Sequence, residues 1–224
     1  MNTRLKLKIG VALLAAAWLA SLAAPPPARH FVWPAPPAEP RITYLRSLKS
    51  PADIGQSANV LSRFGHWITG ENGQRLALQK PFGLALDEDG NLCITDTGAN
   101  AVCFLDFKHK QWRRFTTAGK TALASPVAVA KRNGIFYVAD SELGKVLAFH
   151  ADGLMSFEIT NSLVRPVGLA IAGGNLAVAD SQTHAVQVFD LAGKLLFSFG
   201  KRGAGPGEFN FPTTLPPTAT ANGW

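Results

Sequence analysis

One pattern of strand, turn, strand and aspartate occurs three times in the chain, and it constrains the fold more than any other feature. Each copy opens with a proline, turns at a glycine and ends a second apolar run with an aspartate. The copies are Pro81–Asp96 (PFGLALDEDGNLCITD), Pro126–Asp140 (PVAVAKRNGIFYVAD) and Pro166–Asp180 (PVGLAIAGGNLAVAD). Their prolines are 45 and 40 residues apart, and their aspartates 44 and 40. A repeat with a period in the low forties is typical of propeller blades.

The third copy continues into the clearest strand pattern of the chain. Apolar runs separated by turn residues span Val167–Ile171, Asn175–Ala179, Ala185–Phe189 and Leu195–Phe199. Short runs of this kind predict a four-stranded antiparallel meander. We therefore expect an all-β chain, a β-propeller of four-stranded antiparallel blades.

The residues that recur in each copy have physical roles in such a blade. A proline suits the start of an inner strand, where no ladder donor is needed. Small residues such as Gly83 and Gly168 let inner strands approach one another. A glycine in the first turn supplies a positive φ at Gly90, Gly134 and Gly174. The closing carboxylates are expected to accept backbone amides of the following loop, as structural rather than cation-binding groups: Asp96, Asp140 and Asp180.

These motifs resemble the NHL-repeat β-propellers, in particular their exported bacterial members. The resemblance rests on the PxGLA…GNLx[IV]xD core of copies one and three, the VQVFD strand and the connector FGKRGAGPGEFNFP (199–212). It covers Pro81 to Pro212 and implies a ring of typically about six blades. Such proteins usually place a basic residue before the valine that opens the third strand. Here only Lys145 does so, whereas Ala101 and Ala185 occupy the other two positions.

The repeats divide residues 79–215 into blades at 81–125, 126–165 and 166–211, with a fourth beginning at Pro212. Residues 216–224 (PPTATANGW) do not continue the pattern, because Pro216-Pro217 cannot extend a central strand. We interpret the chain as an incomplete ring of about three blades, and hypothesise a frameshift after Leu215. The alternatives are a genuine half-ring, or two chains that assemble into one ring.

The N-terminal part has a different composition. Arg4, Lys6 and Lys8 precede an apolar run, so residues 1–24 are expected to be a secretory signal or an uncleaved membrane anchor. Residues 25–40 form a proline-rich linker of polyproline type. Residues 41–78 are expected to hold one strand (41–48) and a short amphipathic helix (50–69).

Export sets the chemistry expected of the two cysteines. Cys93 and Cys103 lie on adjacent predicted strands of one hairpin. In an oxidising compartment they could form a disulfide, which requires that they lie directly opposite each other. The other interpretation is two small buried hydrophobic residues.

No cluster of residues predicts catalysis, a metal or a cofactor. The five histidines lie in different units, and none has a second histidine at metal-ligand spacing. His184 with Asp180 is the one pair that could be imagined as channel-facing ligands. Ser141 and Ser181, which follow closing aspartates, are expected to serve in turns.

The chain has a modest net positive charge and one local cluster of basic residues. The formal net charge is +7, of which the N-terminal segment supplies three charges. Interleaved aromatic and basic residues resemble a polyanion-binding surface, and the candidate residues are Lys108, Lys110, Trp112, Arg113 and Arg114. Export argues against nucleic acid, so the expected partner is a protein or a cell-envelope polymer.

We therefore expect an exported protein, periplasmic, secreted or held at the membrane by its N-terminal segment. Its expected role is a non-catalytic binding scaffold, with self-association through open blade edges as a further way to assemble. The alternatives are a fragment of a channel-centred propeller enzyme, such as a lyase or lactonase, or a non-functional remnant.

Overall fold

The computed structural model describes residues 31–35, 37–39, 41–56 and 77–215. Its contacts divide the chain into two units, Met1–Ser47 and Leu48–Trp224, which are described separately. Within the described residues, no helix has the length and apolar character needed to cross a membrane.

The first unit contains a small hairpin where the sequence predicted a polyproline linker and one longer strand. Strand β1 (Val32–Trp33) pairs with β2 (Ile42–Thr43), so the strand predicted at residues 41–48 is present but shorter, and the predicted linker contains a two-residue strand. Prolines are tolerated because Pro34 and Pro37 lie outside the paired positions. In the described part of the chain, the backbone hydrogen bonds of this hairpin join only residues 31–33 to residues 41–44. The ladder between β1 and β2 is therefore short.

The second unit contains three four-stranded antiparallel sheets in chain order, which we call blades one, two and three. Blade one comprises β3 (Pro81–Leu86), β4 (Leu92–Asp96), β5 (Ala101–Asp106) and β6 (Gln111–Phe115). Blade two comprises β9 (Pro126–Arg132), β10 (Ile135–Asp140), β11 (Lys145–His150) and β12 (Met155–Ile159). Blade three comprises β13 (Pro166–Ala172), β14 (Asn175–Asp180), β15 (Ala185–Asp190) and β16 (Leu195–Phe199). A short ladder of β7 (Thr117–Ala118) and β8 (Thr121–Ala122) lies between blades one and two in the chain.

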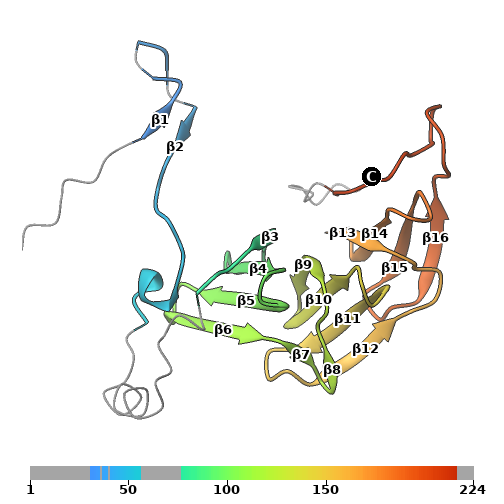
Figure 1. The fold of residues 1–224 in the computed structure, drawn as a ribbon, viewed down its shortest axis with the longest axis horizontal. Coiled ribbons are helices and arrows are strands. Elements are labelled where there is room, and N and C mark those ends of the chain that lie inside the picture. Colours follow the sequence, from blue (N-terminus) through green and yellow to red (C-terminus); the bar gives the residue numbers. More distant parts are fainter. Residues whose placement is uncertain (1–30, 36, 40, 57–76, 216–224) are drawn as a thin grey trace, which may run out of the picture. The chain divides into compact units, whose positions relative to one another are not determined.

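The blades lie side by side in an arc, as β-propeller blades do (Figure 1). Their inner strands are β3, β9 and β13, and β9 contacts both of the others. The predicted all-β fold is confirmed. In blade three the predicted run 195–199 coincides with β16, and the predicted run 167–171 extends by one residue at each end to give β13.

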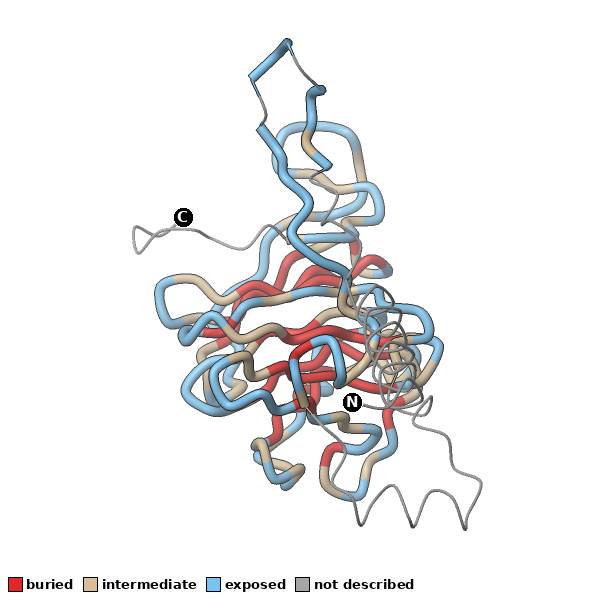
Figure 2. Tube along the Cα trace, turned by 90° about the vertical axis from the view of Figure 1, so that its left-hand side faces the viewer, coloured by how far each residue is buried: buried red, intermediate tan, exposed pale blue. Residues whose placement is uncertain are grey.

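The core consists of the faces where neighbouring blades meet, and the buried residues gather inside the sheets (Figure 2). Between blades one and two, Phe104 packs edge-on against Phe136, with ring centroids 5.3 Å apart. Between blades two and three, Tyr137 lies in one cluster with Phe189. Full burial of an aromatic side chain stabilises a fold by about 2–3 kcal/mol, so these faces dominate blade docking.

The predicted helix at residues 50–69 lies mostly outside the described residues. Only Pro51–Ile54 is helical, as the 3-10 helix η1, and residues 57–69 lie outside the described residues. Asp53 accepts the amides of Lys49 and Ser50 at 2.8 and 2.7 Å, and Gly55 ends the turn with a φ of 77°. Ile54 is buried against blade one, on the face turned away from blade two.

Candidate functional site

The three closing aspartates are the most regular polar feature of the blades, and each is at most 1% exposed. Asp140 accepts amides from the following loop, Glu142 and Leu143, at 3.2 and 3.1 Å. It also accepts amides from the segment that leads into its own blade, Ala124 and Ser125, at 2.8 and 3.0 Å. The predicted contact with the following loop is therefore confirmed, and the contact with the preceding segment was missed.

The other two aspartates make the same kind of contact. The amide donors to Asp96 are Gln79, Lys80 and Gly98. The donors to Asp180 are Val164, Arg165, Gln182 and Thr183. Because these buried carboxylates are engaged by backbone amides, they tie the start of each inner strand to the end of the second strand.

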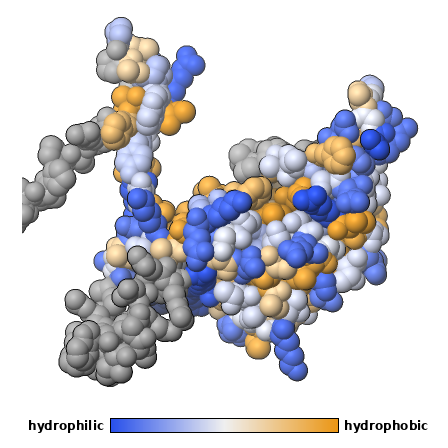
Figure 3. Space-filling view, viewed as in Figure 1, coloured by the Kyte–Doolittle hydropathy of each residue, from blue (hydrophilic) through white to orange (hydrophobic). Residues whose placement is uncertain are grey.

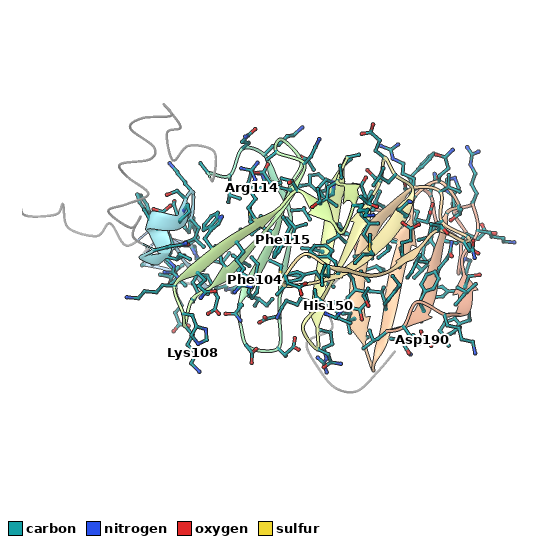
Figure 4. The ribbon with its side chains drawn as sticks, turned by 90° about the horizontal axis from the view of Figure 1, so that it is seen from below. Phe104, Lys108, Arg114, Phe115, His150 and Asp190 are labelled. Atoms are coloured by element: carbon teal, nitrogen blue, oxygen red, sulfur yellow. The ribbon has the colours of Figure 1, made fainter. Side chains whose placement is uncertain are left out.

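The predicted basic cluster does not form one surface. Trp112 is 4% exposed and packs with Ile54 and Leu105, so it is a core residue and is not available for stacking. This corrects the sequence interpretation, which could not tell which face of β6 was covered. Lys108 and Arg114 lie at opposite ends of blade one (Figure 4).

The remaining members of the cluster differ in exposure. Lys108 and Lys110 are exposed in the turn between β5 and β6, and Arg113 is exposed on β6. The Arg113 guanidinium donates to the Ala151 carbonyl of blade two at 3.3 Å and to Gln111 at 2.9 Å. Arg114 is half-buried and donates to the Ala99 carbonyl at 3.5 Å.

His184 and Asp180, the pair considered as ligands, serve different contacts. The Nδ1 atom of His184 accepts the Phe211 amide at 3.2 Å, and the two rings pack 4.6 Å apart. The Ser141 hydroxyl bonds to Ser125, and that of Ser181 donates to the Arg165 carbonyl, as expected of turn residues. Among the described residues, no three His, Cys, Asp or Glu side chains lie together as a metal site.

The two cysteines lie on adjacent strands but not opposite each other. Cys93 pairs with Phe104, and Cys103 pairs with Ile94, so the two thiols point to opposite faces of blade one. Both are free and buried, which excludes a disulfide between them. Burial raises the pKa of Cys93 to about 12 and that of Cys103 to about 11, so both thiols are protonated and unreactive.

The outward face of blade three carries an apolar groove of about 750 Å³ that sequence reasoning missed. Ala177, Val186 and Val188 form its floor. The outer strand β16 borders it with Phe197 and Phe199, which are 55% and 47% exposed. Hydrophobic side chains also reach the surface on the side of the unit where blade three lies (Figure 3).

The same positions in blade two form a buried interface. There the cross-strand rows Ala139–Val146–Ile159 and Tyr137–Ala148–Phe157 face blade three. In blade three the equivalent rows are Ala179–Val186–Phe199 and Ala177–Val188–Phe197. The groove is thus the blade-docking face of blade three. The alternation of apolar residues along β14, β15 and β16 was the signal that could have identified it.

A second hollow, of about 570 Å³, lies across the inner strands of all three blades. Leu84 and Leu86 of β3 line it and are each 68% exposed. At its edge the buried Asp87 carboxylate pairs with Lys131 at 2.7 Å and joins blade one to blade two. Burial alone would raise the pKa of Asp87, but hydrogen bonds from Lys131 and Asn91 outweigh it, and the pKa lies below its ordinary value.

Comparison with known proteins identifies a repeat within blade three. The NHL repeat family matches residues 163–189, which include β13, β14 and most of β15. No curated protein matches the chain.

Several solved structures are similar to this chain at low identity. Hydrazine synthase from Kuenenia stuttgartiensis is 21% identical, with a TM-score of 0.49 over 61% of this chain and 38% of that one. A catalytically inactive virginiamycin B lyase from Staphylococcus aureus, solved with quinupristin, is 13% identical, with a TM-score of 0.49 over 63% and 46%. A streptogramin B lyase is 16% identical, with a TM-score of 0.48 over 60% and 43%. The chain spans less than half the length of each of these proteins. Residues 163–189 thus match an NHL repeat, and the three blades share the strand order and the aspartate contacts of a β-propeller.

Proposed function

We propose that this chain is a non-catalytic scaffold that acts outside the cytoplasm and binds another protein through the groove on blade three. The observation that carries the proposal is the apolar groove on the blade-docking face of blade three. Its floor is apolar, and its aromatic border is about half exposed. Exposed apolar patches of this kind mark interaction sites in soluble proteins.

The blades supply the rigidity that such a surface needs. In each blade a buried aspartate ties the segment that leads into the inner strand to the end of the second strand, as Asp180 at the end of β14 does by accepting four amides. A preformed surface loses little conformational entropy when it binds, so more of the contact free energy goes into affinity. The N-terminal signal or anchor would place this surface outside the cytoplasm.

A site-specific photo-crosslink in cells that export the chain tests the proposal. Benzoylphenylalanine replaces Phe197 at the border of the groove, in the full chain. The matched control carries the same group at Leu154, which is 64% exposed in the turn before β12 of blade two. We expect a protein adduct at position 197 and not at 154. No adduct at 197, or equal adducts at both positions, would show that the groove is not a protein-binding site.

The exposed lysines of blade one support a second candidate, an anionic cell-envelope polymer. Among the described residues, Lys108 and Lys110 form no ion pair. They lie in the turn that leads into the outer strand β6, which carries Arg113. Charges of this kind attract polyanions in a way that salt screens. Replacing Lys108 and Lys110 with Glu should lower retention on a heparin column, whereas Lys194→Glu on blade three should change it less. Equal retention of the two variants would remove this candidate.

A further inference from the structure

The segment that follows blade three, residues 209–215, lies against the inner strand of that blade. A Cβ added at Gly168 of β13 would lie 3.3 Å from the Thr213 carbonyl oxygen. At Gly83, the equivalent position of blade one, an added Cβ would lie 2.5 Å from the Val127 carbonyl oxygen in the inner strand of blade two. Residues 212–215 therefore lie beside blade three where the inner strand of a following blade lies beside blade one.

The apolar residues of this segment have counterparts at the interface of blades two and three. Phe209 and Leu215 stand three residues before and three after Pro212, and both pack on the floor of the groove. Leu163 and Leu169 stand three residues before and after the proline that opens blade three, and both are buried in the cluster shared with blade two. The segment thus reproduces the inner-strand part of a blade interface.

The second and third strands supply the rest of such an interface. Leu176 and Val178 of β14, with Phe189 of β15, are buried in the cluster shared with blade two. Among the described residues, none takes the equivalent positions over blade three. The groove lies there, between residues 212–215 and the side chains of Phe197 and Phe199. Its shape therefore matches the side chains of a strand added beside the segment.

We propose that the groove binds an extended segment of a partner protein by β-strand addition, as the second strand of an incomplete fourth blade. This strand would pair with residues 212–215 and direct two large apolar side chains, two residues apart, onto Ala177 and Val188. Leu176 and Val178 have this spacing where β14 covers blade two. The inference rests on the function proposed above, because it names the kind of protein segment that the groove takes.

The backbone of the segment is available for this pairing. In the part of the chain that the structure describes, no residue accepts a hydrogen bond from the amides of Thr213, Thr214 or Leu215. The Phe211 amide before them donates to Nδ1 of His184 at 3.2 Å, which fixes the start of the segment. The corresponding strand β13 pairs with β14. An unpaired strand edge is a template for another chain, so a partner strand can take the place of β14.

The size and charge of the groove suit a short apolar strand. The groove measures about 750 Å³, and none of the described residues that line it is charged. Six residues at about 3.3 Å each span roughly 20 Å, which is close to the length of the strands beneath. Contacts as small as this are weak, so we expect a dissociation constant on the order of 10–100 µM that changes little with salt.

Fluorescence anisotropy of labelled peptides added to the full-length chain tests the inference. The probe peptide is GNLAVAD, the sequence of residues 174–180, because this strand covers the equivalent face of blade two. The control peptide GNLVAAD has the same composition but places leucine and valine next to each other. Adjacent side chains of a strand point to opposite faces, so the control should bind at least about tenfold more weakly.

Methylated peptides test the backbone pairing. One version of GNLAVAD carries N-methyl groups on its leucine and valine, and the other carries them on the two alanines. Alternate amides of a strand point to one edge, so each version blocks one edge only. A strand that pairs with residues 212–215 through one edge should tolerate one version and lose binding in the other.

A substitution in the floor tests the position of the peptide. Ala177→Tyr would fill the groove and should weaken binding of GNLAVAD at least about tenfold, because it occupies the space of the apolar side chains. The equivalent position of blade two carries Tyr137, so this strand position accepts an aromatic side chain. Leu154→Tyr adds the same side chain to the exposed turn of blade two and should leave binding unchanged. Circular dichroism melting curves establish that both variants are folded, and the peptide comparisons use the wild-type chain.

The outcomes separate this inference from the proposed function. No binding of GNLAVAD up to roughly 1 mM, or equal binding of GNLAVAD and GNLVAAD, overturns the inference. Equal binding of the two methylated peptides, or a folded Ala177→Tyr variant that binds as wild type does, also overturns it. A protein adduct at position 197 in the photo-crosslinking experiment would then still support the scaffold function, with a partner that is not an added strand. No adduct at position 197 rejects both.

Discussion

At the scale of single residues, the closing aspartates explain why so few polar groups are needed to hold a blade. Asp140 is fully buried and accepts amides from both sides of its blade, at Ala124, Ser125, Glu142 and Leu143. A carboxylate has enough lone pairs for all of these donors, which a serine or asparagine lacks. The aspartate therefore fixes two chain segments with one side chain.

Removal of this carboxylate should be costly. We expect Asp140→Ala to lower the free energy of unfolding by about 3–5 kcal/mol, because several buried amides lose their acceptor. Urea denaturation of the purified chain measures the change. Asp152→Ala is the control and should cost less than about 1 kcal/mol, since Asp152 is exposed and, among the described residues, accepts only the Leu154 amide. Equal losses in the two variants would contradict the structural role of Asp140.

At the scale of elements, the inner strands depend on small residues where two blades converge. A Cβ added at Gly83 of β3 would lie 2.5 Å from the Val127 carbonyl oxygen of blade two and 2.9 Å from Thr95 Oγ1. The equivalent Gly168 of β13 has no further blade beside it among the described residues. A Cβ there would meet atoms at 3.2 Å or more, the nearest being the Leu215 amide nitrogen.

This difference predicts unequal effects of the same substitution. Gly83→Ala should lower the free energy of unfolding by about 2–3 kcal/mol, because β3 and β9 must move apart. Gly168→Ala should cost less than about 1 kcal/mol, since only a shift of a few tenths of an ångström is needed. Thermal unfolding followed by circular dichroism compares the two variants. A larger loss for Gly168→Ala would mean that the inner strand of blade three is as crowded as that of blade one.

At the scale of the whole molecule, specific polar contacts join blades that are otherwise held by apolar packing. Lys131 of blade two reaches the buried Asp87 of blade one at 2.7 Å, and its ammonium lies 4.9 Å from the Phe104 ring centroid. Tyr137 of blade two donates its hydroxyl to the Leu191 carbonyl, in the turn between β15 and β16 of blade three, at 2.9 Å. These contacts fix the position of one blade relative to the next.

The Asp87–Lys131 pair should make blade docking depend on pH. The pKa of Asp87 is lowered in the folded chain, so its contribution to stability is complete above the ordinary aspartate pKa of about 3.9 and is lost at lower pH. Lys131→Met should therefore lower the free energy of unfolding by about 3 kcal/mol at pH 6–7, and by progressively less below pH 4. Urea denaturation between pH 3 and pH 7 measures both variants.

The exposed pair of Lys145 and Glu158, 3.0 Å apart, provides the control. Lys145→Met should cost less than about 1 kcal/mol at any of these pH values, because solvent screens an exposed pair. A loss in Lys131→Met that does not change between pH 3 and pH 7 would show that the stabilisation comes from packing of the lysine stem rather than from the ion pair.

The sequence by itself determined the features that depend on neighbours in the chain. Its period in the low forties gave three blades, and its apolar runs gave the strands of blade three to within one residue. Turn glycines at Gly90, Gly134 and Gly174 have positive φ values of 77°, 76° and 82°, as predicted. These features follow from local sterics and from strand periodicity, which a single sequence contains.

The tertiary structure alone decided which side chains face each other and which face stays open. A shift of one residue in strand register reverses the face of every side chain. That parity places Cys93 and Cys103 on opposite faces and turns Trp112 inward, against η1. The groove of blade three likewise depends on what packs beside it, because the outer-strand residue of one row is buried in blade two (Ile159) whereas its equivalent in blade three (Phe199) is about half exposed. Such outcomes are set by contacts between segments distant in the chain, and local patterns do not specify them.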